Sequence, residues 1–455
     1  MSFADFIRQH EGDDPVRLLF SRDKYPDIDL DLAVTTLEVR RKLKTKVPEW
    51  YAVPSLVYPF RLSGEQCSSS ETARYKAMLI DRIGREGIPP QTASTSFRPL
   101  PPQAAGPSLL CGRGWPQVCD GTPSRLRVAD LTGGMGVDCW AFAQVSEVVL
   151  YNEMQEGLAR ATELNFRELG VVNVRFSCRK VEVGKVWEVL DGFEPDIIFL
   201  DPARRGDDGR KVFLIEECKP DVLGLLPELF EAGRFVLLKL SPMADISMAC
   251  KRLEHVREVH VVASGGECKE LLFILDREWE GGYTVFVVEN GTVMEIPGQA
   301  GNDGKGQAGS DCARHGRPDR PSEIPCAGSI LFEPGKALSK AGAFNLPCER
   351  FGLTKLSAHT HLYAGEVIPD ELRPFGKVFE VLEVLPLNNR TMKEAGKRWP
   401  QAEVTARNVP MTSDLLRKKI GCASGGDVHL FGVRADAAEG SGNYLIVTKK
   451  RYGTD

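Results

Sequence analysis

The sequence has no long apolar run and no regular cysteine pattern. No segment approaches the roughly 18 to 20 uninterrupted apolar residues that a membrane-spanning helix needs. Residues 1–14 carry acidic side chains and no apolar core, unlike a signal peptide. The 12 cysteines are scattered without a repeated Cys-x-x-Cys spacing. We therefore expect a cytoplasmic protein with reduced thiols and no membrane partner.

Positive charge is not in excess either. The formal net charge is -5 at pH 7, because 63 acidic residues outnumber 58 lysines and arginines. This balance excludes a surface that is basic throughout, but it allows a local basic patch that binds nucleic acid. From Gly335 onward, lysine and arginine outnumber aspartate and glutamate, so such a patch is expected in the C-terminal part.

Two segments rich in small and polar residues divide the 455 residues. Residues 91–121 are rich in proline, glycine and serine, which predicts a flexible linker. Residues 298–328 predict a disordered insertion, because they offer almost no apolar surface to bury. The segment before the linker, residues 1–90, has apolar side chains at helical spacing and predicts a helical N-terminal domain.

Between these two segments, residues 122–278 alternate strand-like and helix-like patterns. Apolar runs at 125–131, 195–202 and 234–242 are separated by helical patterns, which predicts a parallel sheet with helices on both faces. The last two predicted strands, EVHVVAS and ELLFILD, leave almost no room for a helix between them. They therefore predict an antiparallel hairpin at the edge of the sheet. From Gly282 onward the alternation stops, which predicts an α+β region.

The first strand of residues 122–278 ends in a glycine-rich loop. Asp130 is followed by the sequence LTGGMG, in which the chain turns from strand to helix. Glycine lets a backbone turn tightly and pass close to a ligand. Glu153 ends the next strand, where a carboxylate can accept hydrogen bonds from the two hydroxyls of a ribose. The predicted nucleotide cradle comprises Asp130, Thr132, Gly133, Gly134, Gly136 and Glu153; a coincidental turn beside a surface acid is the alternative.

The fourth strand ends in the sequence DPARR, at the sheet edge where open α/β sheets bind ligands. Proline after Asp201 fixes the backbone there, so the carboxylate is held in a defined turn. Arginines at this point can grip a phosphate in a bidentate manner, unless they pair with Asp207 or Asp208. We expect Asp201, Pro202 and Arg204 to be catalytic, and Arg205 and Lys239 to bind substrate.

The N-terminal region contributes a further candidate segment. Ser68 and Glu71 have the spacing of a capping box and predict a helix that begins after Ser68. Tyr75 and Lys76 follow on this helix, and we expect them to cover the site or to guide the substrate.

Three other side chains are candidates for reactive or metal-binding groups. Cys268, expected in the loop between the last two strands, has a lysine neighbour that favours a thiolate, and an ordinary free thiol is the alternative. His359 and His361 alternate onto one face of a predicted strand, but no third and fourth ligand accompanies them. We therefore expect no metal.

Several of these segments together resemble a family of bacterial class I S-adenosylmethionine-dependent methyltransferases with a C-terminal THUMP-like domain. The resembling segments are residues 65–77, 130–138, 151–154, 201–205, 239–243, 265–273 and 340–346. The resemblance implies an α/β fold with a seven-stranded, Rossmann-like sheet, with S-adenosylmethionine as the cofactor. It also implies a ferredoxin-like domain at 279–375 and a THUMP-like domain at 376–452.

The resemblance favours RNA as the substrate, because THUMP domains proper bind RNA. In the segment 407–421, the side chains of Arg407, Arg417, Lys418 and Lys419 could contact an RNA backbone, or they could belong to an ordinary exposed helix. Thr132 stands where the family loop has its first glycine. Ala203 and Arg204 replace the second proline and the aromatic residue of the amine methyltransferases. A non-catalytic RNA-binding protein, and methylation of a protein or small molecule, remain the alternatives.

Overall fold

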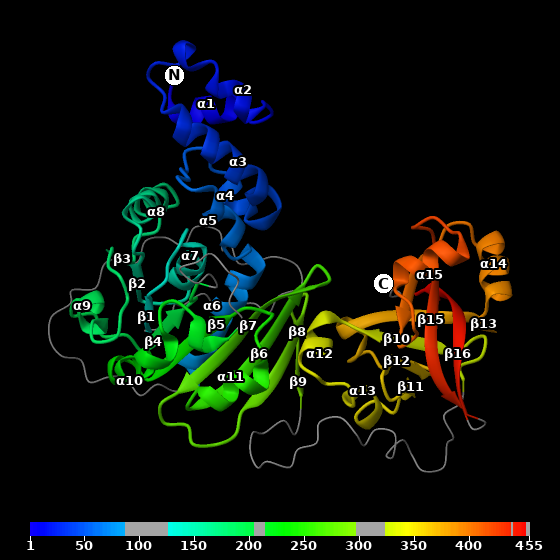
Figure 1. Cartoon of the computed structure of the whole chain (residues 1–455). Coiled ribbons are helices and arrows are strands. Elements are labelled where there is room, and N and C mark those ends of the chain that lie inside the picture. The colour runs from blue at the N-terminus through cyan, green and yellow to red at the C-terminus, as the bar shows by residue number, and fades with distance from the viewer. Residues whose placement is uncertain (87–125, 204–213, 297–323, 438–439, 452–455) are drawn as a thin grey trace. The chain divides into compact units, whose positions relative to one another are not determined.

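The computed structural model describes residues 1–86, 126–203, 214–296, 324–437 and 440–451 (Figure 1). The predicted linker at 91–121, most of the predicted insertion at 298–328, and both Arg204 and Arg205 lie outside the described residues. The chain divides into two compact units. The first comprises residues 1–260 and 270–283, and the second comprises residues 261–269 and 284–455.

The first unit begins with helices that pack directly onto its sheet layer. These are α1 (Phe3–Gln9), α2 (Pro15–Leu19), η1 (Arg22–Lys24), α3 (Leu30–Lys46), α4 (Pro48–Tyr51), α5 (Arg61–Gln66) and α6 (Ser70–Arg85). Trp50 is fully buried, and its ring meets Trp140 and Phe166 edge-on at centroid distances of 6.2 and 6.3 Å. The N-terminal helices therefore share an apolar core with helices α7 (Val137–Ala143) and α8 (Glu156–Glu168), which carry Trp140 and Phe166.

The start of α6 differs from the prediction by one residue. Ser69, rather than Ser68, is the N-cap, and its hydroxyl accepts a hydrogen bond from the amide of Thr72. The expectation that Ser68 caps this helix is therefore wrong. Ser68 is instead buried and donates a hydrogen bond to the carboxylate of Asp138.

The strands of the first unit are β1 (Arg127–Asp130), β2 (Val148–Asn152), β3 (Val174–Ser177), β4 (Ile197–Leu200), β5 (Phe235–Leu240), β6 (Val256–Ser264) and β7 (Glu267–Asp276). Their order in the sheet is β3-β2-β1-β4-β5-β7-β6. The first five are parallel, and β7 is antiparallel to β5. Helices α7 (Val137–Ala143), α8 (Glu156–Glu168), α9 (Val186–Leu190), α10 (Val222–Ala232) and α11 (Ile246–Arg252), with η2 (Ile215–Glu217), follow or separate these strands.

The strand termini of this parallel sheet position the candidate site. Every residue of β4 and β5 is buried, as expected for central strands that have helices on both faces. Because β1, β2, β4 and β5 run in the same direction, the residues that follow them meet at one edge. This edge therefore brings together the loop after β1, Glu153 after β2, Asp201 after β4 and Lys239 in β5.

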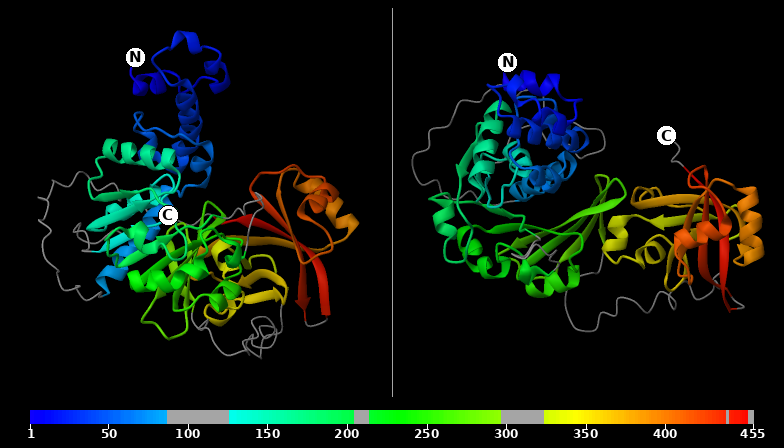
Figure 2. Two further views of the ribbon diagram at one scale, coloured as in Figure 1. Left: turned by 60° about the vertical axis from the view of Figure 1, so that its left-hand side comes forward. Right: turned by 45° about the horizontal axis from the view of Figure 1, so that its top comes forward.

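The second unit is built on a seven-stranded sheet with the order β11-β12-β10-β13-β16-β15-β14. Its strands run from yellow to red in Figure 2. The strands are β10 (Ile330–Pro334), β11 (Thr354–Ser357), β12 (Thr360–Gly365), β13 (Gly376–Pro386), β14 (Glu403–Arg407), β15 (Val428–Ala437) and β16 (Gly440–Lys450). Its helical segments are α12 (Lys336–Lys340), α13 (Leu346–Glu349), η3 (Arg373–Phe375), α14 (Asn389–Arg398) and α15 (Ser413–Ile420). Here β14 and β15 pair in parallel and are joined by α15, whereas the other strand pairs of this sheet are antiparallel. The regular βαβ repeat of the first sheet therefore does not continue, as predicted.

The prediction that the β6–β7 hairpin forms the edge of the first sheet is wrong. Residues 261–269 form the tip of the β6–β7 hairpin within the second unit. There β8 (Thr284–Glu289) follows β6 in the hydrogen-bonded order, and β9 (Thr292–Ile296) follows β8. Within the parts of the chain that the structure describes, no helix is both long enough and apolar enough to cross a membrane.

Candidate functional site

The loop between β1 and α7 requires glycine at three positions. Gly134 and Gly136 have φ angles of +53° and +86°, a conformation that other residues adopt at a cost. A Cβ atom at Gly136 would lie 2.6 Å from the Cγ2 atom of Thr162. At Gly133 a Cβ atom would lie 2.2 Å from the ring of Tyr151, whose hydroxyl donates to the carbonyl of Gly134 at 2.5 Å. The loop is therefore held close against β2 and α8.

Glu153 meets this loop, as the sequence predicts. One of its carboxylate oxygens accepts a hydrogen bond from the amide of Gly134 at 3.0 Å, and the other accepts from the amide of Gln155 at 2.8 Å. An ionised carboxylate offers about four acceptor positions, so it can still receive hydroxyl donors from a ligand. The side-chain amide of Asn152, at the end of β2, donates to the carbonyl of Leu131 and so holds the start of the loop against β2.

Asp130 is the least satisfied polar group at the site. One carboxylate oxygen accepts the amide of Thr132 at 3.2 Å, and the other is buried without a hydrogen-bond partner among the described residues. Burial raises the pKa of Asp130 well above its ordinary value, and the nearby carboxylate of Asp138 raises it further. A buried acceptor without a partner is costly, so Asp130 is suited to receive a donor or a positive charge from a ligand.

Thr132 links the loop to the next strand end. Its hydroxyl accepts a hydrogen bond from the amide of Asp201 at 2.6 Å. The threonine therefore fixes the turn that follows β4, besides lying in the predicted cradle. Pro202 is buried, and the amide of Ala203 donates to the carbonyl of Lys219 at 2.7 Å. These contacts hold the Asp-Pro turn at both ends.

Lys239 brings a buried positive charge to Asp201. Its ammonium group forms an ion pair with the Asp201 carboxylate and lies 4.0 Å from the Oε2 atom of Glu270. Burial alone lowers the pKa of Lys239, but Asp201, Glu270 and Asp138 together raise it above its ordinary value. These carboxylates therefore favour the charged form of the Lys239 ammonium group.

A second buried lysine continues this arrangement toward α6. The Nζ atom of Lys76 donates to both oxygens of Glu270 at 2.8 and 3.0 Å, and to the hydroxyl of Ser68 at 3.0 Å. It also lies 3.1 Å from the Oδ1 atom of Asp138. We call the series Asp138, Lys76, Glu270, Lys239 and Asp201 the buried ion-pair chain.

Glu270 is the central carboxylate of the buried ion-pair chain. Burial raises the pKa of Glu270 above its ordinary value, while the ammonium groups of Lys76 and Lys239 act in the opposite direction. Sequence reasoning did not select Ser68, Asp138 or Glu270 as site residues. The available signal was the glutamate that precedes the apolar run LLFIL, because a charge inside a buried strand requires a partner.

Tyr75 belongs to a polar network with two side chains of β6. Its hydroxyl is 2.8 Å from Nδ1 of His260, whose Nε2 is 2.9 Å from Glu258. Burial lowers the pKa of His260, which favours the neutral imidazole. Tyr75 and Lys76 are both fully buried. Their predicted contact with substrate would therefore require the segments that cover them to move.

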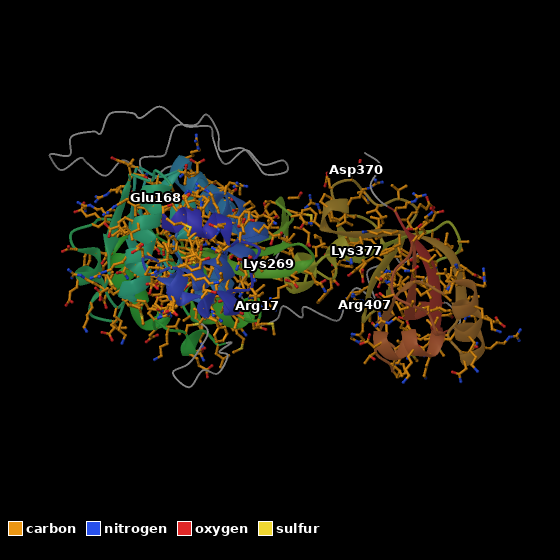
Figure 3. All side chains as sticks on the ribbon, turned by 90° about the horizontal axis from the view of Figure 1, so that it is seen from above. Arg17, Glu168, Lys269, Asp370, Lys377 and Arg407 are labelled. Carbon is orange, nitrogen blue, oxygen red and sulfur yellow. The ribbon has the colours of Figure 1, made fainter. Side chains whose placement is uncertain are left out.

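The predicted location of Cys268 is wrong. This residue lies in β7, not in the loop before it. Its neighbour Lys269, labelled in Figure 3, forms an ion pair with Glu267 at 2.8 Å. The histidine prediction is wrong as well, because His359 lies in the turn between β11 and β12 rather than on a strand with His361. Among the described residues, no group of three or more histidine, cysteine or acidic side chains is placed to hold a metal.

Some of the basic side chains in the segment 407–421 form ion pairs with acidic side chains. Arg407, which lies on β14 and is labelled in Figure 3, forms an ion pair with Glu333 at 2.8 Å. Arg417, on α15, pairs with Asp414. Lys418 and Lys419 lie exposed at the end of α15. An RNA contact at this helix remains a prediction.

The chain is similar to two known domain families and to two curated relatives. Family models match a ferredoxin-like domain at residues 331–371 and a THUMP domain-like segment at residues 376–450. Two curated relatives from Mycobacterium tuberculosis, strains CDC 1551 and H37Rv, are described as uncharacterized S-adenosylmethionine-dependent methyltransferases. Each is 26% identical over 227 residues, which are 49% of this chain and 56% of the relative. The chain thus spans little more than half the length of these curated relatives.

A solved structure matches nearly the whole chain. It comes from Porphyromonas gingivalis W83, is provisionally described as a methyltransferase, and is 27% identical with a TM-score of 0.74. The match covers 99% of this chain and 98% of the other. The predicted fold class is therefore confirmed: a class I methyltransferase sheet with N-terminal helices precedes ferredoxin-like and THUMP-like domains.

Proposed function

We propose that this chain is an S-adenosylmethionine-dependent methyltransferase. The observation that carries the proposal is the contact between Glu153 and the amide of Gly134, which joins the acid after β2 to the glycine loop after β1. This arrangement suits an adenosine whose ribose lies at Glu153. The curated relatives and the P. gingivalis structure support the same activity.

The residues present fit this cofactor. Glu153 would accept hydrogen bonds from the ribose hydroxyls, and residues 132–136 would lie along the methionine part, where only glycine leaves room for close approach. The buried, unpartnered oxygen of Asp130 would receive a donor or positive charge from the same ligand. When bound, S-adenosylmethionine supplies a methyl group carried on a positively charged sulfur.

On the acceptor side, Asp201 is proposed to orient the group that receives the methyl. Its carboxylate is held by Lys239 and its amide by Thr132, so its position is fixed before substrate arrives. Such alignment of two reacting atoms can supply much of the rate of a displacement reaction. Pro202 shapes the turn, while Arg204 and Arg205 are proposed to hold the substrate nearby.

We propose an RNA base as the acceptor, in the cytoplasm. The THUMP domain-like segment at 376–450 and the exposed lysines on α15 support this choice. RNA binding through such a segment is an argument from fold. Methylation of a protein or small molecule, or RNA binding without catalysis, would appear as distinct results in the tests below.

Titration calorimetry with the full chain tests the cofactor. S-adenosylmethionine and its demethylated product should bind, whereas ATP and NAD should not. Mass spectrometry of nucleosides from cellular RNA then tests the acceptor, because one methylated nucleoside should be missing in cells without this protein. Cofactor binding without any missing nucleoside would move the search to protein and small-molecule acceptors. Failure to bind the cofactor would contradict the proposal.

A further inference from the structure

We propose that Lys76, on the N-terminal helix α6, is a positioning residue for methyl transfer. By neutralising Glu270, it leaves Lys239 available to hold Asp201. This inference rests on the proposed function, in which Asp201 orients the methyl acceptor. It gives the N-terminal helices a part in the reaction although Lys76 itself is fully buried.

Glu270 lies between two ammonium groups but hydrogen bonds with only one of them. Lys76 donates to both of its oxygens at 2.8 and 3.0 Å, while Lys239 lies 4.0 Å from the nearer oxygen. Lys239 is therefore free to form its close ion pair with Asp201. The bidentate contact of Lys76 satisfies the carboxylate that would otherwise compete for Lys239.

The two carboxylates near Lys239 differ in their access to water. The side chain of Glu270 is 4% exposed, whereas that of Asp201 is 31% exposed. An unpaired carboxylate is far more costly in the interior than at a partly hydrated position. If Lys76 were removed, Lys239 would therefore turn from Asp201 to Glu270, and Asp201 would lose its fixed position.

Two further contacts hold Lys76 in this role. The Ser68 hydroxyl accepts from Lys76 and donates to Asp138 at 2.7 Å, and Asp138 itself lies 3.1 Å from the lysine. Asp138 belongs to the first turn of α7, immediately after the glycine loop. Lys76 thus links two elements of the site. One is α7, which begins directly after the proposed cofactor loop, and the other is β7, which pairs with the strand β5 that carries Lys239.

A double substitution distinguishes positioning from mere stabilisation. Lys76→Met leaves Glu270 uncompensated, whereas Lys76→Met combined with Glu270→Gln removes the competing charge as well. The matched control is Arg234→Met, which removes the ion pair with Asp276 at 2.9 Å. That pair joins the same two strands, β5 and β7, at the end opposite Lys239, because Phe235 pairs with Asp276 and Leu240 with Leu271.

The measurement is methyl transfer from labelled S-adenosylmethionine to total RNA from cells lacking this protein, with kcat and KM for the cofactor obtained separately. Lys76→Met should lower kcat by about 10-fold or more, as expected for loss of alignment, and change the cofactor KM little. The double variant should return kcat to within about threefold of wild type, since alignment of Asp201 is regained. Arg234→Met should keep kcat although its thermal midpoint falls.

An unchanged kcat in Lys76→Met would overturn the inference, because Glu270 would then have taken up a proton instead of capturing Lys239. A folded double variant as slow as Lys76→Met would overturn it too. If Lys76→Met does not fold, the double variant decides alone: near-normal kcat supports the inference and a 10-fold loss contradicts it. An inactive wild-type protein that binds RNA and cofactor would refute the proposed function itself, and the wild-type control separates the two failures.

Discussion

At the residue scale, Gly136 is the position where the proposed cofactor loop tolerates change least. Its φ angle of +86° and the 2.6 Å approach to Thr162 leave no room for a side chain. We expect Gly136→Ala to displace the loop and to lower the affinity for S-adenosylmethionine by about 10-fold or more. Titration calorimetry measures this change directly.

Gly170 provides the matched control for this substitution. It also has a left-handed φ angle, +70°, but no atom lies within 4 Å of where a Cβ would be. Gly170→Ala should therefore cost backbone strain of about 1 kcal/mol and leave cofactor affinity unchanged. Equal affinities for Gly136→Ala and wild type would show that the loop does not contact the cofactor.

The individual residues of the site were predictable only where a local signal marks them. Glycines after a strand and an acid at the end of the next strand are visible in the sequence, and the structure brings Gly134 and Glu153 together. The contact of Lys76 with Glu270 joins residues 194 positions apart, and no local pattern reveals it. Thr132 was placed in the cradle, but its hydrogen bond to Asp201 depends on the neighbouring strand β4.

At the scale of single elements, the N-cap of α6 determines where the helix carrying Lys76 begins. The Ser69 hydroxyl accepts the amide of Thr72 at 3.2 Å. Ser69→Ala should destabilise the first turn by about 1 kcal/mol, which enlarges its open population and corresponds to about fivefold faster amide exchange. Hydrogen–deuterium exchange of the α6 amides in the full chain measures this rate. Unchanged exchange would mean that Ser69 does not cap the helix in solution.

The elements of the parallel sheet were largely predictable from the sequence, for a physical reason. Strands buried on both faces read as continuous apolar runs, and IIFL of β4 and FVLLKL of β5 lie within the predicted ranges. The helix start was missed by one residue, because three consecutive serines, 68 to 70, offer equivalent caps to local reasoning. The edge of the sheet was predicted wrongly because β8 lies beside β6 in the sheet, and no pattern within the hairpin itself reveals that neighbour.

At the scale of the whole molecule, stability should depend on pH through a partly buried histidine of the second unit, His429. Burial lowers the pKa of His429 to about 4, and its ring stacks on Phe431 at a centroid distance of 4.1 Å. The unfolded chain takes up this proton near the ordinary histidine pKa of 6.5, whereas the folded chain resists it. The stability from the neutral imidazole is therefore present above pH 6.5 and falls as the pH drops toward 4.

A thermal unfolding series between pH 7.5 and 4.5 checks this expectation. The midpoint of the full-length protein should fall with pH, and His429→Phe should reduce the size of that fall. The variant also loses the hydrogen bond between the imidazole and Thr405, so its midpoint at pH 7.5 should be lower than that of wild type. An identical pH dependence in both proteins would exclude His429 as a contributor.

The architecture of the molecule followed from the alternation of patterns along the chain, together with the resemblance of its motifs. The matched ferredoxin-like and THUMP domain-like segments, 331–371 and 376–450, lie within the α+β region expected after Gly282. Their shared seven-stranded sheet could not be predicted, because β10 pairs with β13 across the boundary between the two matched segments. Long-range pairing of this kind leaves no periodic signal in either segment.

The most direct test of the central claim is methyl transfer itself. Purified full-length protein would be incubated with labelled S-adenosylmethionine and total RNA from cells lacking this protein, beside the Asp201→Ala variant. We expect label to enter RNA with the wild-type protein and to fall by about 10-fold or more with the variant. The variant loses the carboxylate held by Lys239 and keeps the cradle that binds the cofactor. Cofactor binding without label in RNA, or equal labelling by both proteins, would contradict the central claim.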